Sequence, residues 1–141
     1  MLGCKKKNPQ TYYKFSHKFA TLLKMRTVIQ NELNELVSAI TETVAADAVI
    51  LFGSFAYGTP TDDSDIDLYV VVADKSIRPL EAMQKISEAV GAVQKRPVDI
   101  LVGSESAFHE RQAHATIEKE VSQKGIRLFT RNGSAFGEKY A

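Results

Sequence analysis

The fold is decided by residues 48–72, which read AVILFGSFAYGTPTDDSDIDLYVVV. Two short apolar runs, 48–52 and 65–72, are rich in the β-branched and aromatic residues that favour strands. The segment between them is rich in Gly, Pro, Thr, Asp and Ser, which are common in turns. This stretch therefore predicts two consecutive strands, mostly buried, joined by a turn that can bring their polar ends together.

Two acidic residues stand on the second predicted strand. Asp65 and Asp67 are two apart, so their side chains project from the same face. Two like charges about 4 Å apart repel by about 4 kcal/mol at an effective dielectric constant near 20. A shared proton, a cationic side chain or a metal ion must offset this repulsion. Mg²⁺ fits best, because it prefers oxygen ligands and accepts phosphate groups among them.

A third acid and a glycine–serine pair complete the candidate site. Asp99 lies inside the apolar run 97–102, and it can join the acid pair if this strand lies beside the second one. Three carboxylates can hold two cations, which suits an in-line displacement at phosphorus. Gly53 lets a phosphate approach the backbone, and Ser54 adds an amide and a hydroxyl if it opens a helical turn. Each feature alone is common, but their conjunction is specific.

The remaining pattern predicts an α/β (α+β) domain in which helices flank a small mixed sheet of about four strands. Apolar residues at helical spacing mark the helices, and Pro79 suits a first helical turn. Gly125 suits the end of the last helix. In chain order, the predicted helices are 22–44, 79–93 and one from Ser104 or Ser106 to about Lys124, and the predicted strands are 48–52, 65–72, 97–102 and 126–129.

Composition excludes several classes of protein. The 141 residues, 44% hydrophobic and 25% charged, are typical of one globular domain. The net charge of +1 is too balanced for a nucleic-acid packaging protein, and the single cysteine, Cys4, excludes an intrachain disulfide. No apolar run approaches the roughly 18 residues of a membrane span, and no signal peptide is recognisable. We therefore expect a cytoplasmic protein without membrane contact.

Positive charge is concentrated at the N-terminus. Residues 1–26 hold seven basic residues and no acidic one, whereas the remainder holds 11 basic and 17 acidic residues. We interpret residues 1–24 as a solvated basic arm or helix extension, with an RNA contact by its lysines as the alternative. Met25 is an alternative translation start. The catalytic domain is then expected over 25–130, followed by a flexible tail at 131–141.

The motif resembles the signature of the DNA polymerase beta-like nucleotidyltransferase superfamily. That signature is a hydrophobic residue, Gly, Gly or Ser, a spacer, then acid, hydrophobic, acid, hydrophobic. Here it reads Phe52-Gly53-Ser54, a spacer of ten residues, and then Asp65-Ile66-Asp67-Leu68. GSFAYG followed by SDIDL looks more closely like the minimal nucleotidyltransferases, or MNT proteins, over about residues 26–130. The resemblance implies the polymerase beta-like fold.

The resemblance also implies roles for the motif residues. Gly53 and Ser54 would bind the β- and γ-phosphates of ATP. Asp65, Asp67 and Asp99 would be the catalytic residues and would hold two Mg²⁺ ions, with Asp99 helping to activate an acceptor hydroxyl. That hydroxyl would attack the α-phosphate, take up AMP and release pyrophosphate.

Two further positions of the motif bear on the nucleotide. Ser64 directly precedes the acid pair and is expected to bind the nucleotide as well. Many MNT proteins have Arg where this chain has Tyr57, and a tyrosine cannot supply the positive charge that an arginine gives to a triphosphate. Nucleotide affinity or acceptor choice is expected to reflect that difference.

A partner is implied too. MNT proteins are often encoded beside an all-helical HEPN toxin, a ribonuclease, and transfer AMP to a tyrosine near its catalytic histidine. We expect an antitoxin of this kind, acting on a HEPN-domain partner, with its homo- or hetero-oligomeric state open. Two alternatives remain: a catalytically weak or inactive antitoxin that acts by binding and occlusion, and nucleotidyl transfer to a small molecule or RNA.

Overall fold

The computed structural model describes residues 23–131. The arm predicted for residues 1–24 and the tail predicted for 131–141 fall almost wholly outside this range and stay predictions. Within it, no helix combines the length and the apolar character that crossing a membrane requires.

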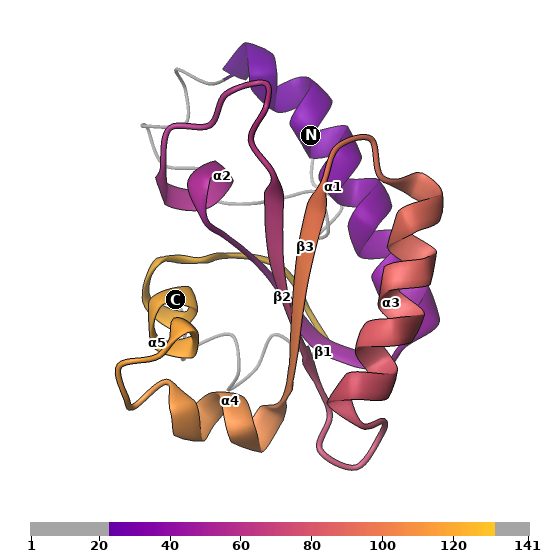
Figure 1. Cartoon of the computed structure of the whole chain (residues 1–141), viewed down its shortest axis with the longest axis vertical. Coiled ribbons are helices and arrows are strands. Elements are labelled where there is room, and N and C mark those ends of the chain that lie inside the picture. The colour runs from indigo at the N-terminus through magenta and orange to yellow at the C-terminus, as the bar shows by residue number, and fades with distance from the viewer. Residues whose placement is uncertain (1–22, 132–141) are drawn as a thin grey trace, which may run out of the picture.

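A four-stranded mixed sheet forms the centre of the fold, in the order β3-β2-β1-β4 (Figure 1). The strands are β1 (Ala46–Phe52), β2 (Ile66–Val72), β3 (Val98–Ser104) and β4 (Ile126–Thr130). β1 pairs antiparallel with β2 and with β4, while β2 and β3 run parallel. The predicted mixed sheet of about four strands is confirmed, and so is the condition that the third strand lies beside the second.

One face of the sheet is covered by α1 (Leu23–Thr43) and α3 (Pro79–Val93), which lie side by side in Figure 1. Their apolar stripes join the sheet side chains that point toward them, with Val49 and Leu51 as examples from β1. The neighbouring residue Ile50 points to the opposite face and belongs to a second apolar cluster. Because both faces are covered, the two central strands β1 and β2 are buried along nearly their whole length, as their apolar sequence pattern indicated.

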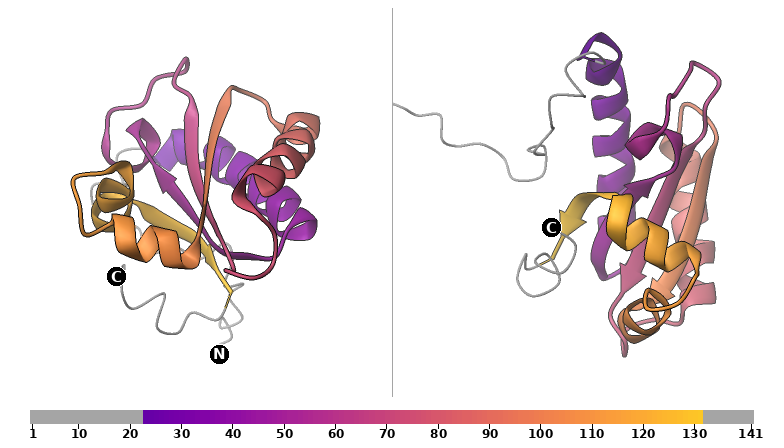
Figure 2. Two further views of the ribbon diagram at one scale, coloured as in Figure 1. Left: turned by 60° about the horizontal axis from the view of Figure 1, so that its bottom comes forward. Right: turned by 90° about the vertical axis from the view of Figure 1, so that its left-hand side faces the viewer.

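The second face is covered by α4 (Glu105–Arg111) and α5 (Ile117–Lys124), seen in front of the strands in the right-hand view of Figure 2. Ser104 caps α4, since its side chain accepts a hydrogen bond from the backbone N–H of Ala107. The prediction of one helix running to Lys124 is wrong, because that helix ends at Arg111 and a new one begins at Ile117.

The break between α4 and α5 comes from Thr116. Its hydroxyl donates a hydrogen bond to the carbonyl of Arg111 at 2.6 Å and accepts one from the N–H of Lys119. A threonine that bonds to nearby backbone groups competes with the helix's own ladder, so it closes one helix and caps the next. The predicted helix end at Gly125 is confirmed, because Gly125 is the C-cap of α5.

A buried carboxylate fastens α5 to the sheet. Glu118 is only 6% exposed, and it accepts hydrogen bonds from the hydroxyl of Tyr69 on β2 and from Nε of Arg111 on α4, both at 3.0 Å. Burial raises the pKa of Glu118, but its hydrogen bonds outweigh that effect and hold the pKa below its usual value. Glu118 therefore stays charged and joins β2, α4 and α5.

Candidate active site

The predicted site residues meet at one end of the sheet. β1 ends at Phe52, and the short helix α2 (Ser54–Tyr57) begins two residues later. On β2, Asp67 lies opposite Phe52 of β1 on one side and opposite Asp99 of β3 on the other. Asp67 therefore lies between the glycine–serine turn and the third acid, as the predicted site requires.

Gly53 makes the turn from β1 into α2 possible. Its φ of 78° lies in the left-handed region, which a side chain disfavours. A Cβ at this position would also overlap Oδ2 of Asp67. The carbonyl of Gly53 accepts the N–H groups of Ala56 and Tyr57, both at 3.0 Å, and so starts the helical turn. Ser54 thus opens a helix, with its backbone close to a carboxylate, where a phosphate and a cation could be held together.

The three acids act on one another electrostatically. Asp67 is half-buried, whereas Asp65 and Asp99 are exposed. The pKa of Asp67 is raised to about 6, first by burial, then by the negative charges of Asp99 and Asp65, and by a hydrogen bond with Asp99. The structure therefore brings together all three acids that the sequence singled out.

The donor set fits a divalent cation that arrives with phosphate groups. Within residues 23–131, no three His, Cys, Asp or Glu side chains form a ready-made metal site. Mg²⁺ is usually held by one or two carboxylates and completes its shell with waters and substrate phosphates. Asp65, Asp67 and Asp99 could supply those carboxylates. A cation would also relieve the repulsion that raises the pKa of Asp67.

Ser64 closes the turn that leads into the acid pair. Its hydroxyl accepts the N–H of Thr61 at 2.8 Å, and its own N–H donates to the carbonyl of Thr61 at 3.1 Å. These two hydrogen bonds fix the conformation of the turn directly before Asp65. Its expected contact with a nucleotide stays a prediction.

Tyr57 links α2 to α5 at the side of the site. Its hydroxyl donates to Oε2 of Glu120 at 2.6 Å, and Nζ of Lys124 lies 5.6 Å from its ring centroid. Burial, then the hydrogen bond with Glu120, raise the pKa of Tyr57, and the charge of Asp67 adds to the effect. The sequence singled out Tyr57 as a motif position but gave no sign of its contacts with Glu120 and Lys124, because no local pattern joins positions so far apart.

An open cavity of about 480 Å³ lies along the same side of α5. Two of its lining residues are those that contact Tyr57. The lining consists of Ala115, Thr116, Ile117, Lys119, Glu120, Gln123 and Lys124. The wall beside α2 is therefore polar and carries two lysines.

Gly53→Ala is expected to lower the free energy of unfolding by more than about 1 kcal/mol, because alanine disfavours a positive φ and its Cβ would press on Asp67. The matched control is Gly91→Ala on α3, where a Cβ meets nothing within 4 Å. That control should gain up to about 1 kcal/mol, since alanine is the better helix former. Urea denaturation of both variants measures the two changes. A Gly53→Ala protein with the free energy of unfolding of wild type would contradict this account of the turn.

The raised pKa of Asp67 predicts a pH dependence of stability in metal-free protein. Because the folded pKa of about 6 exceeds the ordinary value of 3.8, the folded state binds the proton more tightly. This contribution is complete below pH 4 and is lost as pH rises through 6. The stability of wild type relative to Asp67→Asn should therefore fall between pH 4.5 and 7 in EDTA. Denaturation curves at both pH values test this, and a constant difference would refute it.

The comparisons with known proteins agree with this geometry. A family model described as "Polymerase beta, Nucleotidyltransferase" matches residues 34–134. No curated protein matches the chain. Among solved structures, it is similar to a putative nucleotidyltransferase from Sulfolobus solfataricus, with a TM-score of 0.54 and 21% identity over 84% of this chain and 92% of that one.

Two toxin–antitoxin structures are similar as well. One, a toxin–antitoxin with AMP-PNP, has a TM-score of 0.50 and 24% identity over 79% of this chain and 81% of that one. The other, a mutant of the toxin–antitoxin MntA-HpeT, has a TM-score of 0.49 and 21% identity over 77% and 79%. Because the family model covers most of the chain, the protein belongs to the polymerase beta nucleotidyltransferase family.

Proposed function

We propose that this nucleotidyltransferase transfers AMP from ATP to a hydroxyl acceptor, and that the acceptor is a tyrosine of a HEPN-type toxin for which it serves as antitoxin. One observation carries the nucleotidyl-transfer part: the left-handed turn at Gly53 packs directly on Asp67, and Asp99 lies opposite Asp67 on the next strand. A place for phosphate and a place for cations are thus built into one end of the sheet.

The mechanism assigns a task to each of these residues. The turn at Gly53 and Ser54 receives the β- and γ-phosphates, whose charge favours backbone amides at the start of a helix. Asp65 and Asp67, with Asp99, would hold two Mg²⁺ ions, which when bound neutralise charge that develops on the phosphates. Asp99 accepts the proton of the acceptor hydroxyl. The hydroxyl oxygen then forms a bond to the α-phosphorus, and the bond to the bridging oxygen breaks, releasing pyrophosphate.

Lys124 supports the nucleotide part of this proposal. Many MNT proteins place an arginine where this chain has Tyr57, so the chain needs another cation near the triphosphate. Lys124 from α5 lies over the Tyr57 ring and brings a positive charge to the same side of the site. We therefore assign Lys124 the charge that the tyrosine cannot supply.

One further observation supports the acceptor and the antitoxin role. A fold neighbour was solved as a toxin–antitoxin with AMP-PNP, which suggests an adenine nucleotide and a toxin partner. The partner would then supply the acceptor.

Transfer of label from α-labelled ATP to a HEPN partner tests the function. The wild-type protein should label the partner when Mg²⁺ is present. Asp65→Asn/Asp67→Asn should reduce the rate by about 100-fold or more, since it removes two carboxylates that hold the cations. Asp62→Asn/Asp63→Asn, in the exposed turn nearby, is the matched control and should stay within about two-fold of wild type.

The outcome also separates the alternatives. Neutralisation of the toxin by Asp65→Asn/Asp67→Asn, with no label transferred by wild type, would replace the proposal with an antitoxin that acts by occlusion. Label found in RNA or a small molecule, with none in the partner, would keep the enzyme and change its acceptor.

Lys124→Gln should raise the KM for ATP about five-fold, because a charge-assisted contact to a phosphate is worth about 1 kcal/mol or more. Lys119→Gln is the control, since Lys119 lines the same cavity without a contact to Tyr57. Steady-state kinetics at saturating Mg²⁺ gives both values. An equal KM for the two variants would remove Lys124 from the nucleotide site.

A further inference from the structure

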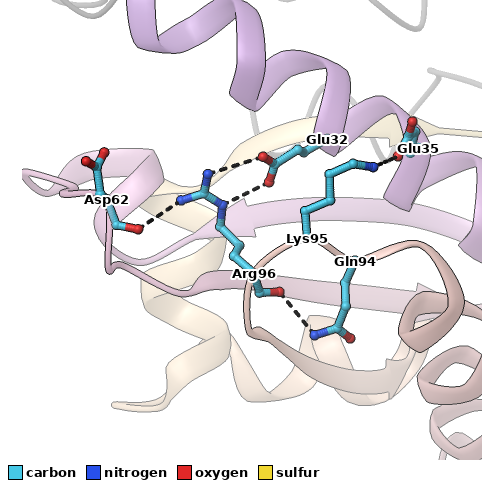
Figure 3. A network of polar contacts seen from close by, with 6 residues as sticks. All are labelled: Glu32, Glu35, Asp62, Gln94, Lys95 and Arg96. Carbon is cyan, nitrogen blue, oxygen red and sulfur yellow. Dashed lines mark hydrogen bonds and ion pairs between the residues drawn. The ribbon is translucent and has the colours of Figure 1, made fainter.

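Arg96 contacts three parts of the molecule that surround the candidate site. It lies in the short link between α3 and β3. Its Nε and Nη2 donate to the two carboxylate oxygens of Glu32 on α1, at 2.8 and 3.2 Å. Its Nη1 donates to the backbone carbonyl of Asp62 at 3.4 Å, as Figure 3 shows. Its guanidinium also lies 5.6 Å from the ring centroid of Phe55 in α2.

The Arg96–Glu32 pair is largely withdrawn from solvent. The Glu32 side chain is 8% exposed and that of Arg96 is 19% exposed. A buried carboxylate left without its partner is costly, so the pair holds the guanidinium in one orientation. The planar fork of arginine can bind both oxygens of Glu32 while a further N–H reaches the turn, which a lysine cannot do.

The turn that Arg96 reaches connects the two halves of the site. Residues 58–65 run from the end of α2, which follows Ser54, to Asp65 at the start of the acid pair. The hydrogen bonds among Thr61, Asp63 and Ser64 are internal to this turn and do not fix where the turn lies. The bond from Arg96 to Asp62 ties the turn to the rest of the molecule.

The position of the third acid is linked to the same residue. The N–H of Ile66, beside Asp65, donates to the carbonyl of Pro97 at 3.0 Å. Pro97 directly follows Arg96, and Asp99 lies two residues further on. The backbone at 96–97 therefore sets where β2 and β3 begin relative to each other.

We propose that Arg96 is the positioning residue of this site, setting the spacing between the glycine–serine turn, the acid pair and Asp99 through its contacts with Phe55, Asp62 and Glu32. The inference rests on the proposed function for its catalytic consequence, but the hold on the turn can be measured without catalysis. Arg96 touches no substrate in this account and acts through the residues that it aligns.

A neighbouring ion pair provides the matched control. Lys95 Nζ and Glu35 Oε1 are 2.9 Å apart, and both side chains are more than half exposed. This pair joins the same link to the same helix, α1 (Figure 3). Arg96 makes additional contacts with Asp62 and Phe55. Losing the Lys95–Glu35 contact removes an ion pair between the same link and α1 and leaves the turn in place.

The experiment compares Arg96→Lys and Glu32→Gln with Lys95→Gln in the full chain. Amide hydrogen exchange of residues 58–66 is measured without ligand, and kcat and KM for ATP are measured in the label-transfer assay. In Arg96→Lys we expect exchange in the turn to rise at least ten-fold and kcat to fall about ten-fold or more, with a smaller change in KM, because misplaced groups act on the transition state. Lys95→Gln should change neither quantity by more than about two-fold.

Each result decides the inference. Unchanged exchange in the turn, or equal effects in Lys95→Gln, would overturn it. Faster exchange with unchanged kcat would also overturn it, because Arg96 would then hold the turn without aligning the site. If Arg96→Lys does not fold, Glu32→Gln, which keeps the shape of the pair, provides the same two measurements. A wild type that transfers no label would end the proposed function, and the exchange of the turn would still decide whether Arg96 positions it.

Discussion

The site depends on one close contact, between the backbone of Gly53 and the carboxylate of Asp67. β1 and β2 pair so that Phe52 lies opposite Asp67, and the chain must leave β1 directly beside that carboxylate. A left-handed glycine makes this turn without a Cβ that would overlap Asp67. The glycine–serine turn and the acid pair are consequently a single structural unit, and neither can shift while the other stays in place.

Two groups of acids within residues 28–131 differ in the way their charge is compensated. The buried acids within residues 28–131 have cationic partners on other elements: Glu32 pairs with Arg96, and Glu118 pairs with Arg111. Asp67 is surrounded instead by other carboxylates, and its pKa is raised to about 6. Glu32 and Glu118 stabilise the fold, since each has a cationic partner within the protein. The negative charge around Asp67 has to be balanced by a ligand.

Local sequence patterns predicted most of the helices and strands and singled out the candidate acids. Strand alternation and turn composition can be recognised within a few residues. The limits of α3 follow from such patterns. The place of Asp99 beside Asp67 depends on the pairing of β2 with β3, which the sequence left as a condition. The break at Thr116 was missed because it depends on which backbone groups one hydroxyl binds. Arg96 was missed because its partner Glu32 lies 64 positions away, and nothing in the sequence near either residue marks the pair.

Asp99 lies on β3, one of the two edge strands of the sheet within the described residues. The outer edge of β3 pairs with no other strand within the described residues, and the nearby Leu101 is 37% exposed. An acceptor would approach Asp99 from the side of this edge, whereas the motif residues on β1 and β2 belong to the central strands. In evolutionary terms, such a domain can acquire a new acceptor through substitutions around its edge strand, while the motif residues on its central strands stay the same.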